Sequence, residues 1–160
     1  MGDIQQGAAA ELWRSAIRNA CAAGAPALDE SQESYLVFVL LRHQRDAHLL
    51  ARIQALEWLQ AQELAGSVRR DALRDVGDRC LLVAGLFPAV AQRRRVSVEY
   101  YVDIGRSAWR GVAEAGRDAY AGLFAHLAEH YLDLVAVLRA LRGEAQARLP
   151  AAMPTPARLH

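Results

Sequence analysis

The residues of this chain with the greatest potential for chemistry lie in two charged, glycine-bearing segments, 75–87 and 98–115. Both read as helices, and Gly77, Gly85 and Gly105 stand in their interiors. A glycine inside a helix costs about 1 kcal/mol relative to alanine. Its presence therefore indicates either that two helices pack closely or that the missing side chain leaves room for a ligand. We favour close packing and keep the pocket as the alternative.

A pocket between these two segments would be walled by aromatic rings, as sites for small ligands commonly are. Its expected lining residues are Gly77, Phe87, Tyr100, Tyr101, Gly105 and Trp109. Whether it exists depends on what faces the two glycines at its centre.

Charged side chains in the same two segments recur three or four positions apart, which places them on one face of each helix. The set comprises Asp75, Asp78, Arg79, Glu99, Asp103 and Arg106. If the two helices pack together, Asp75 or Asp78 can also reach Arg106 across them. We interpret the set as a partly buried ion-pair network that sets helix register. Paired carboxylates acting as acid and base are the alternative, but no nucleophile accompanies them, so we assign no catalytic residue.

His126 and His130 are the candidates for a metal site, because their i, i+4 spacing can place two imidazoles on one ion. Glu129 and Asp133 accompany them, which indicates a solvated polar face. A di-iron bundle needs Glu-x-x-His on two helices, and this chain has no such motif. We therefore expect neither a metal nor another cofactor.

Arg93, Arg94 and Arg95 form the basic cluster of the chain. Nucleic-acid binding requires a broad positive face, often with aromatic platforms. A single triplet in a chain of net charge +1 does not supply one. We expect the triplet to lie on an exposed loop and to contact a protein partner.

The elements that must position these residues are all helical by pattern. The chain has 160 residues, 53% of them hydrophobic, which is enough for one sizeable core. The expected helices span 8–23, 29–43, 46–65, 67–86, 97–116 and 118–143. Asp29 or Ser31, Asp46, Ser67, Ser97 and Asp118 are the expected N-caps. The sequence thus predicts an all-α, single-domain bundle of about six helices over residues 1–143, with a mobile, proline-containing tail at 144–160.

Apolar periodicity indicates which helices are central. The second and fourth expected helices are apolar on nearly every side and should form the middle of the bundle. The third carries Leu49, Leu50, Ile53, Leu56 and Leu59 near one face. Such a stripe is typical of a face turned toward a core.

Several features indicate a cytoplasmic protein. The first residues lack the apolar region of a secretory signal, and no apolar run is long enough to cross a bilayer. Cys21 and Cys80 do not form a disulfide framework, and we expect both to be reduced.

Two motifs carry a family resemblance. Asp-Val-Gly-Asp-x-x-Leu-x-x-x-Gly-Leu-Phe-Pro spans 75–88, and Glu-Tyr-Tyr-x-x-x-Gly spans 99–105. Together they resemble a family of bacterial all-helical proteins for which no activity is known. The resemblance would cover residues 33–141. It implies a bacterial, cytoplasmic setting and brings no catalytic residue or cofactor with it.

Taken together, these patterns predict a non-enzymatic helical bundle that acts by binding a protein partner or a second copy of itself. An exposed apolar helix face and Arg93–Arg95 would make the contact. The alternative is a bundle, or an enzyme, that binds a small ligand or cofactor between the helices of residues 75–87 and 98–115.

Overall fold

The computed structural model describes residues 2–43 and 53–142, and side chains from residue 7 onward. This part of the chain holds eight helices and no strand. The helices are α1 (Gly2–Ala22), α2 (Glu30–His43), α3 (Gln54–Gln62), α4 (Gly66–Leu86), α5 (Pro88–Arg93), α6 (Val98–Glu114), α7 (Ala119–Glu129) and α8 (Tyr131–Ala140). The predicted all-α bundle is confirmed. Asp46, Leu49, Leu50 and the expected tail lie outside the described residues.

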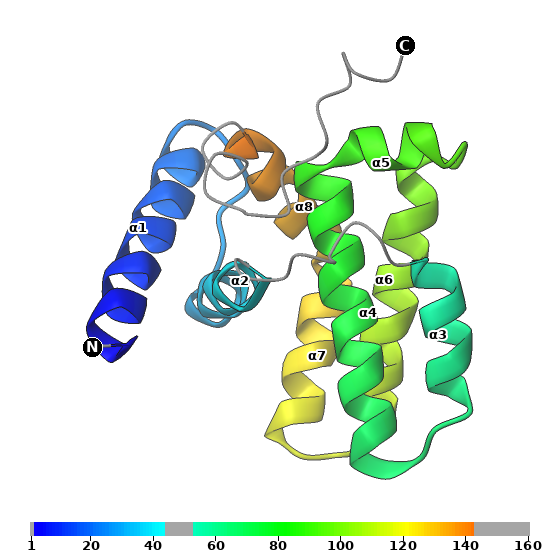
Figure 1. The fold of residues 1–160 in the computed structure, drawn as a ribbon. Helices are drawn as coiled ribbons and strands as arrows, with labels where there is room; N and C mark the ends of the chain where they lie inside the picture. The colour runs from blue at the N-terminus through cyan, green and yellow to red at the C-terminus, as the bar shows by residue number, and fades with distance from the viewer. Residues whose placement is uncertain (1, 44–52, 143–160) are drawn as a thin grey trace.

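The bundle is built around α4. This helix contacts α3, α5, α6 and α8, while α6 also packs on α7. Figure 1 shows α3, α4, α6 and α7 side by side, with α5 crossing one end. The prediction of a central helix holds for α4, whereas α2 lies between α1 and the bundle. It still buries most of its apolar centre, namely Tyr35, Leu36, Val37, Val39 and Leu40, and leaves Phe38 45% exposed.

Side-chain caps begin three of the helices where the sequence predicts them. The Asp29 carboxylate accepts a hydrogen bond from the Gln32 backbone N–H, and the Gln32 side chain accepts one from the Asp29 N–H, each at 2.8 Å. Ser97 and Asp118 accept from backbone N–H groups three residues on. The predicted cap at Ser67 is wrong, because α4 begins at Gly66 with no side-chain cap.

The expected last helix is two helices. The chain bends by 64° at His130, between α7 and α8. No proline or glycine marks the bend, and the apolar period continues through it. The bend accompanies a long-range contact, in which the Tyr131 hydroxyl donates to the Gly77 carbonyl oxygen at 2.8 Å.

A membrane-spanning helix needs both length and an apolar composition. No single helix among the described residues has both. The bent pair formed by α7 and α8 satisfies the two criteria jointly, by length and composition.

Glycines allow α4, α6 and α8 to approach one another closely. Trp109 lies where a Cβ on Gly77 would stand, and the Tyr131 hydroxyl lies where one on Gly105 would stand. Leu138 of α8 occupies the same position beside Gly85. The interior glycines are therefore required by packing, because any side chain would displace a buried neighbour.

We expect Gly105→Ala to destabilise the fold by about 1–3 kcal/mol, because the new methyl group overpacks the contact with Tyr131 and Cys80. The measurement is the free energy of unfolding in urea. The matched control is Gly122→Ala on α7, where nothing lies within 4 Å of the added Cβ. That change should leave stability unaltered or raise it by up to about 1 kcal/mol. Equal stability of the two variants would contradict the packing role of Gly105.

Candidate functional site

A buried carboxylate, Asp78, joins three helices at the centre of the molecule. Its side chain is 0% exposed. Its Oδ1 accepts a hydrogen bond from the Tyr35 hydroxyl of α2 at 2.7 Å and one from the Trp109 indole N–H of α6 at 3.1 Å. The rings of Tyr35 and Trp109 also pack edge to face, with centroids 5.5 Å apart. Asp78 therefore sets the position of α2 and α6 on α4.

Burial dominates the acid–base behaviour of this cluster. Desolvation raises the pKa of Asp78 to about 7, although the Tyr35 hydrogen bond and the positive charge of Arg42 oppose the rise. Desolvation also raises the pKa of the Tyr35 hydroxyl, and the nearby Asp78 charge raises it further. The proton that titrates near neutrality thus belongs to the carboxyl group.

Arg42 of α2 supplies the positive charge next to Asp78. Its Nη1 lies 2.5 Å from Asp75 Oδ1 and 3.7 Å from Asp78 Oδ2. The sequence predicts this role for Arg106, whereas the structure gives it to Arg42. Within the described ranges, no ion pair includes Glu99, Asp103 or Arg106, and Arg79 is buried at 8% exposure. The two expected helices therefore do not share the predicted network, since the pairing runs from α4 to α2.

The space expected to form a pocket between α4 and α6 is filled with aromatic side chains. Phe87 and Trp109 are 1% and 0% exposed, and Trp109 and Tyr131 cover Gly77 and Gly105. Tyr100 and Tyr101 do line a cavity, but it lies elsewhere.

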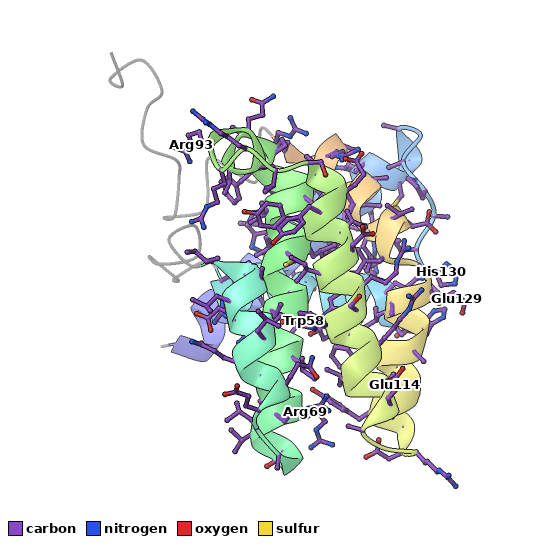
Figure 2. The ribbon with its side chains drawn as sticks, turned by 90° about the vertical axis from the view of Figure 1, so that its right-hand side faces the viewer. Trp58, Arg69, Arg93, Glu114, Glu129 and His130 are labelled. Carbon is purple, nitrogen blue, oxygen red and sulfur yellow. The ribbon has the colours of Figure 1, made fainter. Side chains whose placement is uncertain are left out.

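That cavity, of about 330 Å³, lies between the start of α3, the α5–α6 turn and the start of α6. Its lining residues are Ile53, Gln54, Ala55, Arg94, Val96, Tyr100 and Tyr101. Figure 2 shows α3 beside α6, with Arg93 of α5 above their upper ends. The cavity thus opens where three helix ends meet.

Gln54 is the unusual residue of this cavity. Its side chain is 2% exposed, and both amide atoms, Nε2 and Oε1, lack a hydrogen-bond partner in the part of the chain that the structure describes. A buried polar group without a partner costs about 1–3 kcal/mol. Such groups are rare in folded proteins, and each one calls for an explanation.

Arg94 and Tyr101 define the electrostatics of the cavity wall. Burial raises the pKa of the Tyr101 hydroxyl, and the positive charge of Arg94 opposes the rise. The two groups therefore lie close enough to interact through their charges. The α5–α6 turn that carries Arg94 is held by backbone hydrogen bonds, including Val96 N–H to the Ala91 oxygen at 3.0 Å.

The apolar stripe of α3 faces outward. Ile53, Leu56 and Leu59 are 56%, 50% and 57% exposed, while Gln54 and Ala61 are buried. The stripe is visible in the sequence, but its periodicity predicts that it faces the core. The sequence therefore predicts neither its exposure to solvent nor the cavity at Gln54. The signal available in the sequence was a glutamine and an alanine on the side opposite the stripe.

The three arginines 93–95 differ in their surroundings, since two are exposed to solvent and one lines the cavity. Arg93 and Arg95 are exposed, and Arg95 has a left-handed backbone conformation, with φ of 56°. Arg94 is half-buried in the cavity wall. The segment expected to be an exposed loop is therefore an ordered turn, and one of its three arginines, Arg94, lies against the start of α3.

The two histidines of the weak metal candidate have carboxylate partners. His126 Nε2 lies 2.6 Å from Asp29 Oδ2, and His130 Nδ1 lies 3.5 Å from Asp133 Oδ2. Their rings are in contact, with centroids 4.8 Å apart. In residues 2–43 and 53–142 there is no group of three or more side chains that could hold a metal ion. The His126 contact ties the cap of α2 to α7.

Comparisons with protein-family models, curated proteins and solved structures give no match for this chain. The resemblance of the two motifs at 75–88 and 99–105 to a bacterial helical family stays a prediction.

We predict that Asp78 makes stability depend on pH. Its folded-state pKa of about 7 exceeds the ordinary value of 3.8, so the folded protein holds the proton more tightly than the unfolded chain does. The stabilisation is complete below about pH 4 and is lost as the pH rises to about 7.

The test compares wild type with Asp78→Asn, whose amide oxygen can still accept from Tyr35 and Trp109. Urea unfolding between about pH 4.5 and pH 8 should show wild-type stability falling relative to the variant as the pH rises. Profiles that stay parallel across this range would contradict a raised pKa at Asp78.

Proposed function

We propose that this protein acts by binding, through self-association, and that the outer face of α3 makes the contact. The observation that carries this proposal is the outward apolar stripe of α3. Ile53, Leu56 and Leu59 lie on successive turns and each is at least half exposed. Fully burying such a side chain is worth about 1.5–3 kcal/mol, so a surface that covers them all would bind with useful affinity.

Two further exposed apolar side chains follow this stripe along the chain. Leu64 and Val68, in and after the α3–α4 turn, are 42% and 62% exposed. Singly scattered apolar residues need no explanation, but contiguous ones mark interaction sites. The group formed by α3 and the α3–α4 turn is the candidate interface.

A second copy of the chain is the partner that this surface fits best. An apolar stripe is complementary to itself across a two-fold axis, which is the commonest symmetry of soluble oligomers. The net charge of +1 gives little repulsion between copies.

Charge at the two ends of α3 supports the same partner. Glu63 is exposed at the C-terminal end and follows Leu59 by one helical turn, while Arg94 lies beside Ile53 at the N-terminal end. In an antiparallel pair of α3 helices, Glu63 of each copy would approach Arg94 of the other, while Glu57 adds a carboxylate to the first turn of each helix. The two-fold pairing therefore matches both the stripe and its flanking charges.

The affinity should be moderate. A nine-residue helix is only about 13 Å long. Stable interfaces bury about 1,200–2,000 Å², more than the face of one short helix offers. We therefore expect a dimer that forms at micromolar concentrations and dissociates on dilution.

The test is sedimentation or light scattering across a concentration series reaching about 100 µM. Wild type should pass from monomer to dimer, and Leu56→Glu with Leu59→Glu should raise the dissociation constant at least about tenfold, because it buries charge in the contact. Leu132→Glu on α8 is the matched control, since Leu132 and Leu59 are both 57% exposed. It should leave the dimer intact.

A change at the rim tests the orientation of the pair. Glu63→Lys should weaken the dimer by up to about fivefold, as exposed ion pairs contribute about 0.2–1 kcal/mol. A wild-type protein that remains strictly monomeric, or equal losses from the α3 and α8 variants, would overturn the proposal.

A further inference from the structure

Helices α1 and α2 form a unit, within residues 2–43, that lies at one side of the bundle (Figure 1). The backbone of α2 approaches that of α1 closely, but it makes no comparably extensive approach to α4, α6 or α7. Beyond α2, the main contact of α1 is with α8. The unit is therefore joined to the helices around Asp78 chiefly by side chains of α2. A segment held in this way is a candidate for opening separately from the rest of the molecule.

Tyr35 and Arg42 are the side chains of α2 that reach the buried carboxylate. The Tyr35 hydroxyl donates to Asp78 Oδ1 at 2.7 Å, and its ring meets those of Trp109 and Phe124 at centroid distances of 5.5 Å and 5.2 Å. Asp78 Oδ2 has no hydrogen-bond partner among the described residues, and Arg42 Nη1 lies 3.7 Å from it, too far for a hydrogen bond. Burial with one oxygen unbonded favours the neutral form of a carboxyl group. Ionisation of Asp78 therefore makes the docked position of α2 less favourable.

The other charged groups around Asp78 do not reverse this preference. On α4, Arg74 favours the ionised form, as the arginine of α2 does, and Asp75 opposes it. Helix α6 presents the uncharged Trp109 indole, and α8 presents the Tyr131 hydroxyl, whose own pKa is raised by burial. Desolvation outweighs the attraction of the two arginines, so the pKa of Asp78 rises to about 7.

A second contact joins the unit to α7. His126 Nε2 lies 2.6 Å from Asp29 Oδ2, and this contact is an ion pair only when the imidazole is protonated. The His130 ring lies next to that of His126 and has Asp133 as its own carboxylate neighbour. The side chains of His126 and Asp29 are 36% and 51% exposed, so water screens the pair. Loss of the imidazolium charge at higher pH acts in the same direction as ionisation of Asp78, but more weakly.

We propose that the α1–α2 unit is a pH-sensitive flap, which detaches from α4 when Asp78 loses its proton while α3–α8 stay folded. Detachment admits water to the carboxylate and removes the contact of Tyr35 with it. The aromatic surface beneath Tyr35, formed by Trp109 and Phe124, then becomes accessible. The flap does not depend on the proposed dimer, because among the described helices α3 has no extensive contact with α1 or α2.

The two states of the carboxyl group determine the sign of the pH dependence. In the docked state the pKa of Asp78 is about 7, and in the detached state solvent returns it toward the ordinary value of 3.8. Docking is therefore tightest below about pH 4 and weakens as the pH rises to about 7, above which it levels off.

The test is hydrogen exchange of the backbone amides in the full chain, corrected for intrinsic exchange rates, between about pH 5.5 and pH 8.5. We expect the amides of α2 to be less protected than those of α4 and α6 at every pH, because the flap opens without the bundle. Their protection should fall at least about tenfold across this range. The protection of α4 falls as well, since global unfolding also exposes Asp78, so the lower protection of α2 is what identifies the flap.

Asp78→Asn removes the titrating group and keeps an acceptor for Tyr35. The protection of α2 should then vary by less than about twofold across the same range. The matched control is Asp71→Asn, which changes another carboxylate of α4 whose side chain is 55% exposed, and it should retain the wild-type fall. His126→Gln should also retain most of the fall, because its ion pair is exposed to solvent.

Tyr35→Phe gives a second readout that does not require a change at the carboxyl group. The Tyr35 hydrogen bond stabilises the ionised carboxylate, so without it Asp78 keeps its proton to a higher pH. The protection of α2 should continue to fall above the pH at which wild type levels off. A hydroxyl with a structural role alone would lower protection equally at every pH.

Equal protection of α2 and α4 in wild type would overturn the proposal, because α2 would then open only by global unfolding. A wild-type fall that persists in Asp78→Asn, or one that is abolished in His126→Gln, would overturn it as well.

Discussion

The desolvated carboxylate of Asp78 is the constraint on which the rest of this structure depends. A buried carboxylate is tolerated only when donors surround it, and here they come from Tyr35 on α2 and Trp109 on α6. To reach Asp78, the Trp109 indole must pass over Gly77, which is why no side chain is possible there. The Gly77 carbonyl in turn accepts from Tyr131. Two consecutive residues of α4 thus determine where α2, α6 and α8 lie.

The side of α4 that packs against α3 is built differently. There α3 packs Trp58 and Ala61 against the core beside the buried Gln54, and it leaves a second apolar stripe, Ile53, Leu56 and Leu59, exposed on its outer face. Proteins tend to break local rules at functional sites and to compensate elsewhere. The well-packed aromatic cluster of Tyr35, Trp109, Phe124 and Tyr131 supplies stability that can offset such a departure. The outward stripe and the cavity at Gln54 lie next to each other, since Ile53 belongs to both.

How much could be predicted differs from element to element. The caps at Asp29, Ser97 and Asp118 depend on a side chain and a backbone N–H a few residues apart, and all three were predictable. The bend at His130 was not, because the apolar period runs through it and the contact that accompanies it, Tyr131 to Gly77, spans 54 residues. The sequence predicted Arg106 as the cation beside Asp78, because the helices of these two residues were expected to pack together. The observed cation is Arg42 of α2, which precedes Asp78 by more than the whole of α3 in the sequence. Four residues that line the cavity were named from the sequence: Tyr100 and Tyr101 for a pocket at another place, Arg94 for a partner contact and Ile53 for an apolar stripe.

At the interior glycines the sequence left close packing and a pocket as alternatives, whereas by itself it determined the helical class and most helix ends. These properties follow from interactions within one or two turns, whose energies depend on spacing alone. Only the tertiary structure decided which face of α3 meets water, which cation stands beside Asp78 and where a cavity remains. The physical reason is that apolar burial has no direction of its own. A stripe of leucines is equally suited to a core or to a partner, and the packing of the whole chain selects between them.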